Sequence, residues 1–266
     1  MAFEVLKQAL KDKYVGTILI ALLIFVYIFW LASFYPSIKP MISGYDQLLQ
    51  NPTMKAFLGD DVVSMTTFSG FMTLEVFSYM GLVVGAFFIF MVASFAAGEI
   101  EQKSCELLLS LPVSRVNIIL SRFATILPFT ALIMLAELAA IYLGGVYLGE
   151  DTQIKWFAYA MLFVGAFTIA VGAMSLFISS VMSDGRRAAL LSLGILLAMF
   201  LVENIGTMVT SIDWARKLSL FHYAKVGSIV MAQSVDWVNM GVLLAVAVVF
   251  LVLAVIAFRQ RDINVS

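Results

Sequence analysis

Few residues of this sequence have types and spacings that could do chemistry. The chain has one cysteine, Cys105, and one histidine, His222, so it can form no internal disulfide and offers no cluster with metal-ligand spacing. It lacks a Gly-x-x-x-x-Gly-Lys-Ser/Thr loop for nucleotide phosphates, and no His-Glu-x-x-His pair or Ser-His-Asp set falls in its apolar segments. We therefore expect no catalytic, metal or cofactor site in the chain itself.

Three glutamates lie in or near long apolar stretches and are the candidate intramembrane functional residues. Glu137 is near the middle of its stretch, where a carboxylate costs on the order of 2.5–3.5 kcal/mol to insert into a bilayer. It must face protein or water, and we expect it to act in a translocation path or in coupling. The alternative is a protonated glutamate that hydrogen-bonds a neighbouring helix. Glu75 and Glu203 lie closer to the outer ends of their stretches, where a carboxylate costs less.

The composition indicates that lipid surrounds most of the chain. Hydrophobic residues make up 62% of the 266 residues and charged residues only 12%, against roughly 45–50% apolar residues in soluble domains. So few polar side chains could not cover a water-facing surface. The net charge of −1 and the absence of a Lys and Arg stripe argue against nucleic-acid binding.

Long apolar runs predict the elements that position these glutamates. Crossing a hydrocarbon layer about 30 Å thick takes roughly 20 apolar residues in a helix. We therefore expect an all-α polytopic bundle with about six transmembrane helices, forming a single domain over residues 1–266. The predicted spans are 14–35, 71–97, 123–147, 156–182, 188–208 and 238–258.

The distribution of basic residues predicts the orientation of the chain. Lys and Arg are denser in the short connections on the side of the N-terminus, which include Lys7, Lys11, Arg186 and Arg187. Positive charge in short connections marks the cytoplasmic side. We expect a multi-pass protein of the cell (cytoplasmic) membrane with both termini in the cytoplasm.

Two amphipathic segments flank the spans. Residues 1–13 carry apolar and charged side chains on opposite helical faces, which predicts a short interfacial helix; the alternative is a solvated tail. Residues 212–237 mix aromatic and charged side chains, and we interpret them as one or two amphipathic helices at the external interface. His222 belongs to this segment and is expected to have no ligand role.

The segment 98–122, between the second and third runs, predicts a helix, a break and a second helix. Before Pro112, apolar and acidic side chains alternate between two helical faces. Pro112 cannot continue that helix, and Ser114 is well placed to cap the next one. The apolar face of this second helix is expected to comprise Val116, Ile119, Leu120 and Phe123. The segment is suited to transmit a push from a soluble partner, although an ordinary amphipathic loop on the membrane would show the same pattern.

This segment resembles the cytoplasmic loop of ABC-2-type transporter permeases, which reads acidic, basic, Gly-Thr, Leu-Leu and then Pro-Val-Ser-Arg. The chain has Lys103, Leu107, Leu108 and the run 112–115 in the same order, but Ser104 and Cys105 replace the Gly-Thr pair. Two further segments are similar to that family. They are the Ser-x-Phe-x-Tyr run at 219–223 and the Phe-x-x-Arg-Asp run at 258–262.

The resemblance implies a permease subunit of an ATP-driven transporter, and an exporter rather than an importer. It implies that the loop docks on a separate ABC ATPase subunit, that a second permease copy completes a homodimer or a dimer of close paralogues, and that the chain itself binds no nucleotide. It does not specify the substrate. The implied docking residues are Glu99, Glu101, Lys103, Glu106, Leu107, Leu108, Leu111, Pro112, Val113, Ser114 and Arg115.

Gly81 and Gly85 form a Gly-x-x-x-Gly pair in the second run, and Ala93 and Ala97 continue the stripe. Such stripes allow helices to pack closely, and the partner is either another helix of this chain or the second copy. The alternative function is a self-contained secondary transporter or channel that uses the intramembrane glutamates. The sequence lacks the interrupted, inverted repeats that mark many such proteins.

Overall fold

The computed structural model describes residues 2–49, 67–95, 114–207, 209 and 213–260. Within these ranges every regular element is a helix. The helices, in chain order, are α1 (Ala2–Leu49), α3 (Phe68–Ala93), α6 (Arg115–Ala124), α7 (Ile126–Leu148), α8 (Ile154–Val181), α9 (Gly185–Gly206), α10 (Asp213–Arg216), α11 (Leu220–Ala224), α12 (Val226–Met231) and α13 (Trp237–Gln260).

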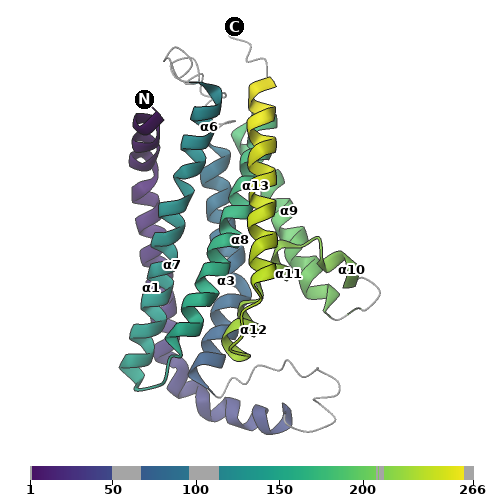
Figure 1. The fold of residues 1–266 in the computed structure, drawn as a ribbon. Coiled ribbons are helices and arrows are strands. Elements are labelled where there is room, and N and C mark those ends of the chain that lie inside the picture. The colour runs from purple at the N-terminus through teal and green to yellow at the C-terminus, as the bar shows by residue number, and fades with distance from the viewer. Residues whose placement is uncertain (1, 50–66, 96–113, 208, 210–212, 261–266) are drawn as a thin grey trace.

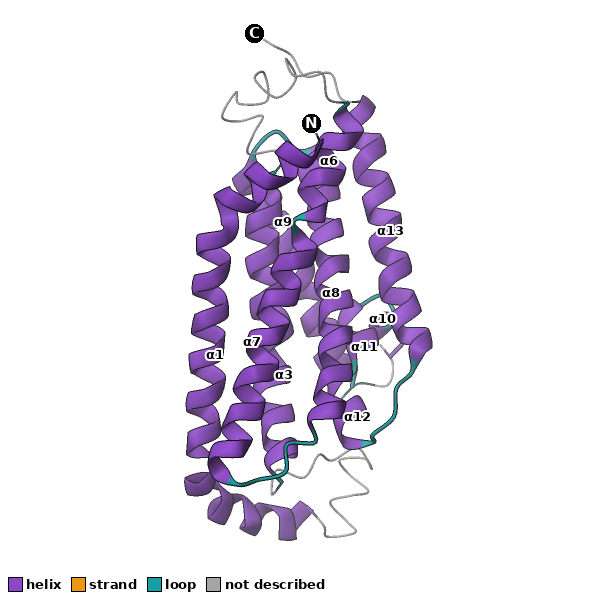
Figure 2. Ribbon diagram, turned by 60° about the vertical axis from the view of Figure 1, so that its left-hand side comes forward, coloured by secondary structure: helices purple, strands orange, loops and turns teal. Residues whose placement is uncertain are grey.

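Six helical stretches in the described ranges are long and apolar enough to cross a membrane. They run side by side along one bundle, and the start of α1, the start of α6 and the end of α13 lie at the same end of it (Figures 1 and 2). The predicted all-α membrane bundle is thus confirmed. Several predicted ends were wrong, and the first and third spans differ most.

The first span belongs to one long helix. We expected an interfacial helix at 1–13 and a span at 14–35, but α1 continues without interruption through residue 13 and on to Leu49. Pro36 and Pro40 lie inside it. A proline inside a helix removes one intrahelical hydrogen bond and bends the helix. The helix can continue past the bend where contacts with neighbouring helices stabilise it. Beyond the prolines, the last turns of α1 lie across the end of the bundle (Figure 2).

The third span is longer than predicted because α6 extends α7 into one apolar stretch, Val116–Leu148. Only Thr125 separates the two helices, and its hydroxyl donates to the Arg122 carbonyl at 2.7 Å. Pro128 explains the interruption, since it has no N–H to donate to the Ala124 carbonyl four residues earlier. The expected cap of α6 is confirmed, because the Ser114 hydroxyl accepts from the Asn117 N–H at 3.2 Å.

The predicted apolar face of α6 needs one correction. Ile118 and Ile119 are buried, whereas Leu120 is 41% exposed. The buried face of α6 thus includes Ile118 and Ile119 but not Leu120. This face contacts mainly α1 and α13.

Helix α8 forms the centre of the bundle. It packs against α3, α7, α9, α12 and α13. In its most apolar stretch of 18 residues, 83% of the residues are buried. Small residues allow this close approach. The Ser175 and Ser179 hydroxyls donate to carbonyls of α3, at 3.3 Å to Ile89 and 2.9 Å to Ala93.

The segment between α9 and α13 contains three short helices, where we expected one or two. Helix α10 keeps the expected surface position, with Trp214 exposed. Helices α11 and α12 are partly buried, with Ser228 of α12 exposed. They pack among α3, α8, α9 and α13, and Leu220, Ile229 and Val230 are buried there. The chain thus turns back into the bundle before α13 begins.

Candidate functional site

The residues on either side of the 96–113 segment pack against the bundle. We call them its two stems: the end of α3 up to Phe95, and the start of α6 from Ser114. Most of the residues expected to dock an ATPase, from Glu99 to Val113, lie outside the described residues. On the α3 side, Phe95 is 2% exposed. On the α6 side, Ser114 caps the helix at its first turn. The Arg122 guanidinium carbon lies 5.8 Å from the Phe95 ring centroid, so the two stems are in contact.

Glu137 lies on the buried face of α7. Its side chain is 0% exposed, so of the two expected environments, protein or water, it has the first in this structure. Neither carboxyl oxygen has a hydrogen-bond partner in the described part of the chain. The Thr130 hydroxyl, two turns earlier on the same face, is also buried without a partner. The alternative of a hydrogen bond to a neighbouring helix is therefore not found among the described residues.

Glu75 has a different environment from Glu137, although both lie in apolar helices. It is exposed on α3 and lines a groove of about 360 Å³ between α3 and α1. The other lining residues are apolar or aromatic.

Glu203, near the end of α9, binds the segment that follows it. The Arg216 guanidinium donates to its Oε1 from Nη2 at 2.8 Å and from Nε at 3.3 Å. Arg216 also donates to Asp213 at 2.9 Å. The hydrogen bond to Glu203 is the main cause that raises the pKa of Arg216 above its ordinary value. His222 Nδ1 lies 3.5 Å from Glu203 Oε2, within ion-pair distance. Glu203 therefore has a structural partner.

Further contacts hold α11 against this part of the bundle. The Ser219 hydroxyl donates to the Met199 carbonyl of α9 at 2.9 Å. The Phe221 ring centroid lies 4.7 Å from that of Phe167 and 5.4 Å from that of Phe200. Both Ser219 and Phe221 belong to the Ser-x-Phe-x-Tyr run noted in the sequence.

The Gly-x-x-x-Gly pair of α3 packs against helices of this chain. A Cβ added at Gly81 would lie 3.3 Å from the Phe221 ring, and one added at Gly85 would lie 3.0 Å from the Leu196 side chain. The predicted close packing is present. It involves α9 and α11, and also α8 through Phe167 and Val171.

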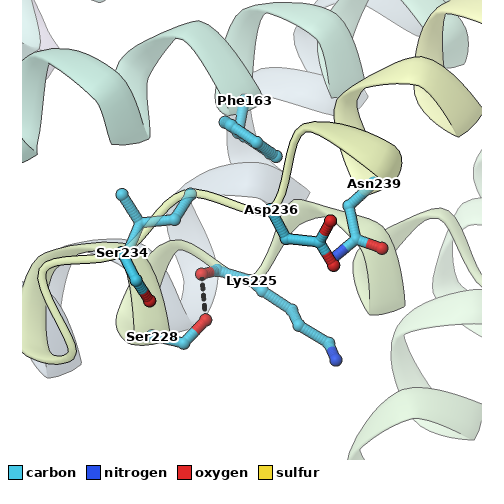
Figure 3. A pocket seen from close by; sticks show the side chains of 7 residues that line it. Phe163, Lys225, Ser228, Ser234, Asp236 and Asn239 are labelled. Carbon is cyan, nitrogen blue, oxygen red and sulfur yellow. Dashed lines mark hydrogen bonds between the residues drawn. The ribbon is translucent and has the colours of Figure 1, made fainter.

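A second, smaller pocket of about 190 Å³ lies where α12 approaches the start of α13. Figure 3 shows that the Asp236 carboxylate and the Asn239 amide point toward one another, while the Lys225 side chain extends away from Ser228. The Ser228 hydroxyl donates to the Lys225 carbonyl at 2.8 Å. These groups meet at the chain surface, and their arrangement indicates no reaction.

The three predicted glutamates therefore do not form one site. Glu137 is enclosed, Glu75 faces outward into a groove, and Glu203 is paired. The described residues contain no group of His, Cys, Asp and Glu that could hold a metal ion. Sequence reasoning missed Arg216 as the partner of Glu203, although opposite charges on both sides of a helix end are a signal for such a pair. It also missed Tyr79, which follows Glu75 by one helical turn.

Comparison with known proteins identifies the family. A family model described as "Multidrug efflux system permease Rv1217c, C-terminal domain" matches residues 8–259. No curated protein matches the chain. The matched range includes all six candidate spans apart from the first two residues of the first span and the last residue of the last. Since the match covers nearly the whole sequence, the chain belongs to the family of this multidrug efflux permease domain.

Proposed function

We propose that the protein is the membrane-spanning subunit of an ATP-driven ABC exporter, with ATP hydrolysis performed by a separate subunit. Membership of an efflux permease family supports the transport role. The resemblance of residues 99–122 to the loop of ABC-2-type permeases supports the ATP-driven mechanism. The observation that carries the proposal is the anchoring of both stems of that loop at the end of the bundle where α1 begins and α13 ends.

The contacts at the stems suggest how force would enter the membrane. A push on the 98–114 segment acts on α3 through the buried Phe95 and on α6 through its cap at Ser114. In this proposal, the contact between Arg122 and Phe95 couples the two stems. Helix α6 continues almost directly into α7, the helix that carries Glu137. A displacement of the loop is thus passed to the third span.

In the proposed assembly, two permease copies and two ATPase subunits form one transporter in the cytoplasmic membrane. The end of the bundle that holds both termini faces the cytoplasm, where ATP is available. The substrate then moves outward between the spans when the ATPase subunits close on ATP.

The partner can be identified by purification of the tagged permease in a mild detergent. We expect it to retain a soluble ATPase with a phosphate-binding loop, encoded in a neighbouring reading frame, at one ATPase per permease. A matched control is the permease with Glu101→Lys and Glu106→Lys, which should retain less of the ATPase. Elution of the wild-type permease without any ATPase would overturn the proposal.

One observation favours a second candidate, a proton- or ion-coupled secondary transporter. A buried carboxyl such as Glu137, which has no hydrogen-bond partner in the part of the chain that the structure describes, is the kind of group that such proteins use to carry a proton. The two candidates differ in their energy source. An ABC exporter stops when ATP is removed and continues when a protonophore collapses the proton gradient, whereas a proton-coupled transporter shows the reverse.

A further inference from the structure

The groove between α1 and α3 has an apolar floor and an aromatic rim. Ile24, Val76 and Met80 are almost fully buried and form the floor. Tyr27 and Tyr79 are 45% and 61% exposed and form part of the rim. The volume of about 360 Å³ falls within the range of roughly 300–1,000 Å³ that is typical of small-molecule pockets. We call these residues, together with Glu75, the α1–α3 groove.

The sequence places these side chains on the two facing stripes. The groove is lined on α1 by residues with the spacing of one helical face, namely Ile20, Leu23, Ile24 and Tyr27. The lining residues of α3 also share one face, and they are Glu75, Val76, Tyr79, Met80 and Val83. The helices run antiparallel (Figure 1), and the Tyr35 ring lies 5.5 Å from Phe68 and 5.4 Å from Phe71. Tyr27 precedes Tyr35 by eight residues, and Tyr27, Glu75 and Tyr79 line the same groove.

Glu75 is the charged residue of this groove. No Lys, Arg or His lines it, and Glu75 has no ion pair or hydrogen bond within the described ranges. This differs from Glu203, which is paired with Arg216. The Tyr79 ring also contacts Phe200 of α9, at 6.3 Å between centroids, so the aromatic rim continues beyond the groove.

We propose that the α1–α3 groove binds a lipophilic organic cation. The apolar floor favours a hydrophobic body. The faces of Tyr27 and Tyr79 attract positive charge, and the Glu75 carboxylate has no counter-ion among the described residues. A hydrated inorganic ion fits poorly, because Mg²⁺ and Ca²⁺ need several oxygen ligands and the groove offers one carboxylate and two phenols. The proposal deepens the proposed function by naming a substrate class for the efflux permease.

A second copy of the chain is the competing occupant. A two-fold contact centred on the groove would bring the two Glu75 carboxylates toward one another. Like charges in a medium of low dielectric repel strongly, and the groove supplies no cation to offset them. The charge of the groove therefore favours a cation over a second copy.

The test uses two probes of the same shape and opposite charge, tetraphenylphosphonium and tetraphenylborate. The full chain is reconstituted in phosphatidylcholine nanodiscs without ATP or ATPase, and binding is measured by equilibrium dialysis against empty nanodiscs. We expect saturable binding of tetraphenylphosphonium, weakened about 10-fold by Glu75→Gln and retained by Glu75→Asp. Tetraphenylborate should not lose affinity in Glu75→Gln.

Two further variants control for charge and for aromatic contact. Glu4→Gln removes a carboxylate from the exposed start of α1, outside the groove, and should leave tetraphenylphosphonium binding unchanged. Tyr79→Leu keeps an apolar side chain but removes the ring, and should weaken binding roughly 2- to 5-fold. Unchanged elution volume and thermal midpoint in each variant show that the fold is intact.

Two outcomes would overturn the inference. They are equal binding of both probes by the wild type and unchanged tetraphenylphosphonium binding in Glu75→Gln. Because this assay contains no ATP, it is separate from the test of the proposed function. Binding that depends on Glu75 without any ATP-driven transport would refute the proposed function alone.

Discussion

Glu203 Oε1 of α9 lies 2.8 Å from Arg216 Nη2 of α10. Both side chains are largely buried, and His222 of α11 approaches the other carboxylate oxygen. One carboxylate thus holds two successive short helices against the end of a membrane span. Any movement of α9 must carry α10 and α11 with it, or break this ion pair.

A double-mutant cycle can measure this ion pair. Glu203→Gln or Arg216→Gln alone should destabilise the protein by about 1–3 kcal/mol, because each removes a hydrogen-bonded ion-pair partner from a largely buried charge. The double variant should cost less than the sum of the two single changes. The measurement is the thermal midpoint of the detergent-solubilised protein. Strictly additive shifts would show that the pair contributes nothing.

Gly144 permits the close approach of α7 and α1. A Cβ at Gly144 would lie 2.6 Å from the Ala32 Cβ, a group attached directly to the α1 backbone. Gly144→Ala must therefore push the helices apart, at a cost of about 1–3 kcal/mol, or a lower thermal midpoint by several degrees.

The matched control for Gly144→Ala is Gly194→Ala. No atom lies within 4 Å of the added Cβ at Gly194, which is also inside a helix. This variant should leave the thermal midpoint unchanged or raise it slightly. Equal shifts in the two variants would contradict the helix contact at Ala32.

Glu137 should reveal a conflict between stability and transport. Glu137→Leu removes two buried oxygens that have no hydrogen-bond partner among the described residues and replaces them with an apolar side chain of similar size. This change should stabilise the protein by about 1–3 kcal/mol. Glu137→Gln keeps unpaired polar atoms and should change stability less. Both variants should reduce efflux while they assemble normally. A lower thermal midpoint in Glu137→Leu would contradict the unpaired state, and normal efflux in both would remove Glu137 from the mechanism.

The number of spans could be predicted because run length and composition alone decide whether a helix can cross a bilayer. The helix ends could not, since they depend on tertiary contacts. Pro36 and Pro40 bend α1 but do not end it, and Pro128 interrupts a span that begins earlier than its apolar run. In both cases the packing of neighbouring helices preserves helical structure that local propensity would end.

The burial of residues 212–237, which precede α13, could not be predicted from the sequence either. Its alternation of aromatic and charged residues is typical of an interfacial helix, yet Leu220 and Ile229 are buried between spans. The chemical environment of each glutamate could not be predicted for the same reason. Position along the helix gave depth in the membrane, but only tertiary structure distinguishes the enclosed Glu137, the paired Glu203 and the exposed Glu75.

The cap at Ser114 should be important for the rigidity of the loop stem. Ser114→Ala removes the acceptor of the Asn117 N–H and should cost about 0.5–2 kcal/mol of local helix stability. Hydrogen exchange at the amides of residues 116–118 should become faster, while exchange in α8 stays the same. Ser114→Asp retains a capping oxygen and should restore slow exchange. Unchanged exchange in Ser114→Ala would show that the cap does not hold this stem.

The coupling of ATP hydrolysis to transport tests the central claim most directly. The permease and its ATPase are reconstituted in proteoliposomes, and hydrolysis and efflux are measured together for the wild type and for a variant combining Glu101→Lys, Glu106→Lys and Pro112→Ala. We predict that the variant inserts normally and that ATP hydrolysis continues in its liposomes, but that efflux per ATP falls sharply. Efflux per ATP equal to that of the wild type would contradict the account.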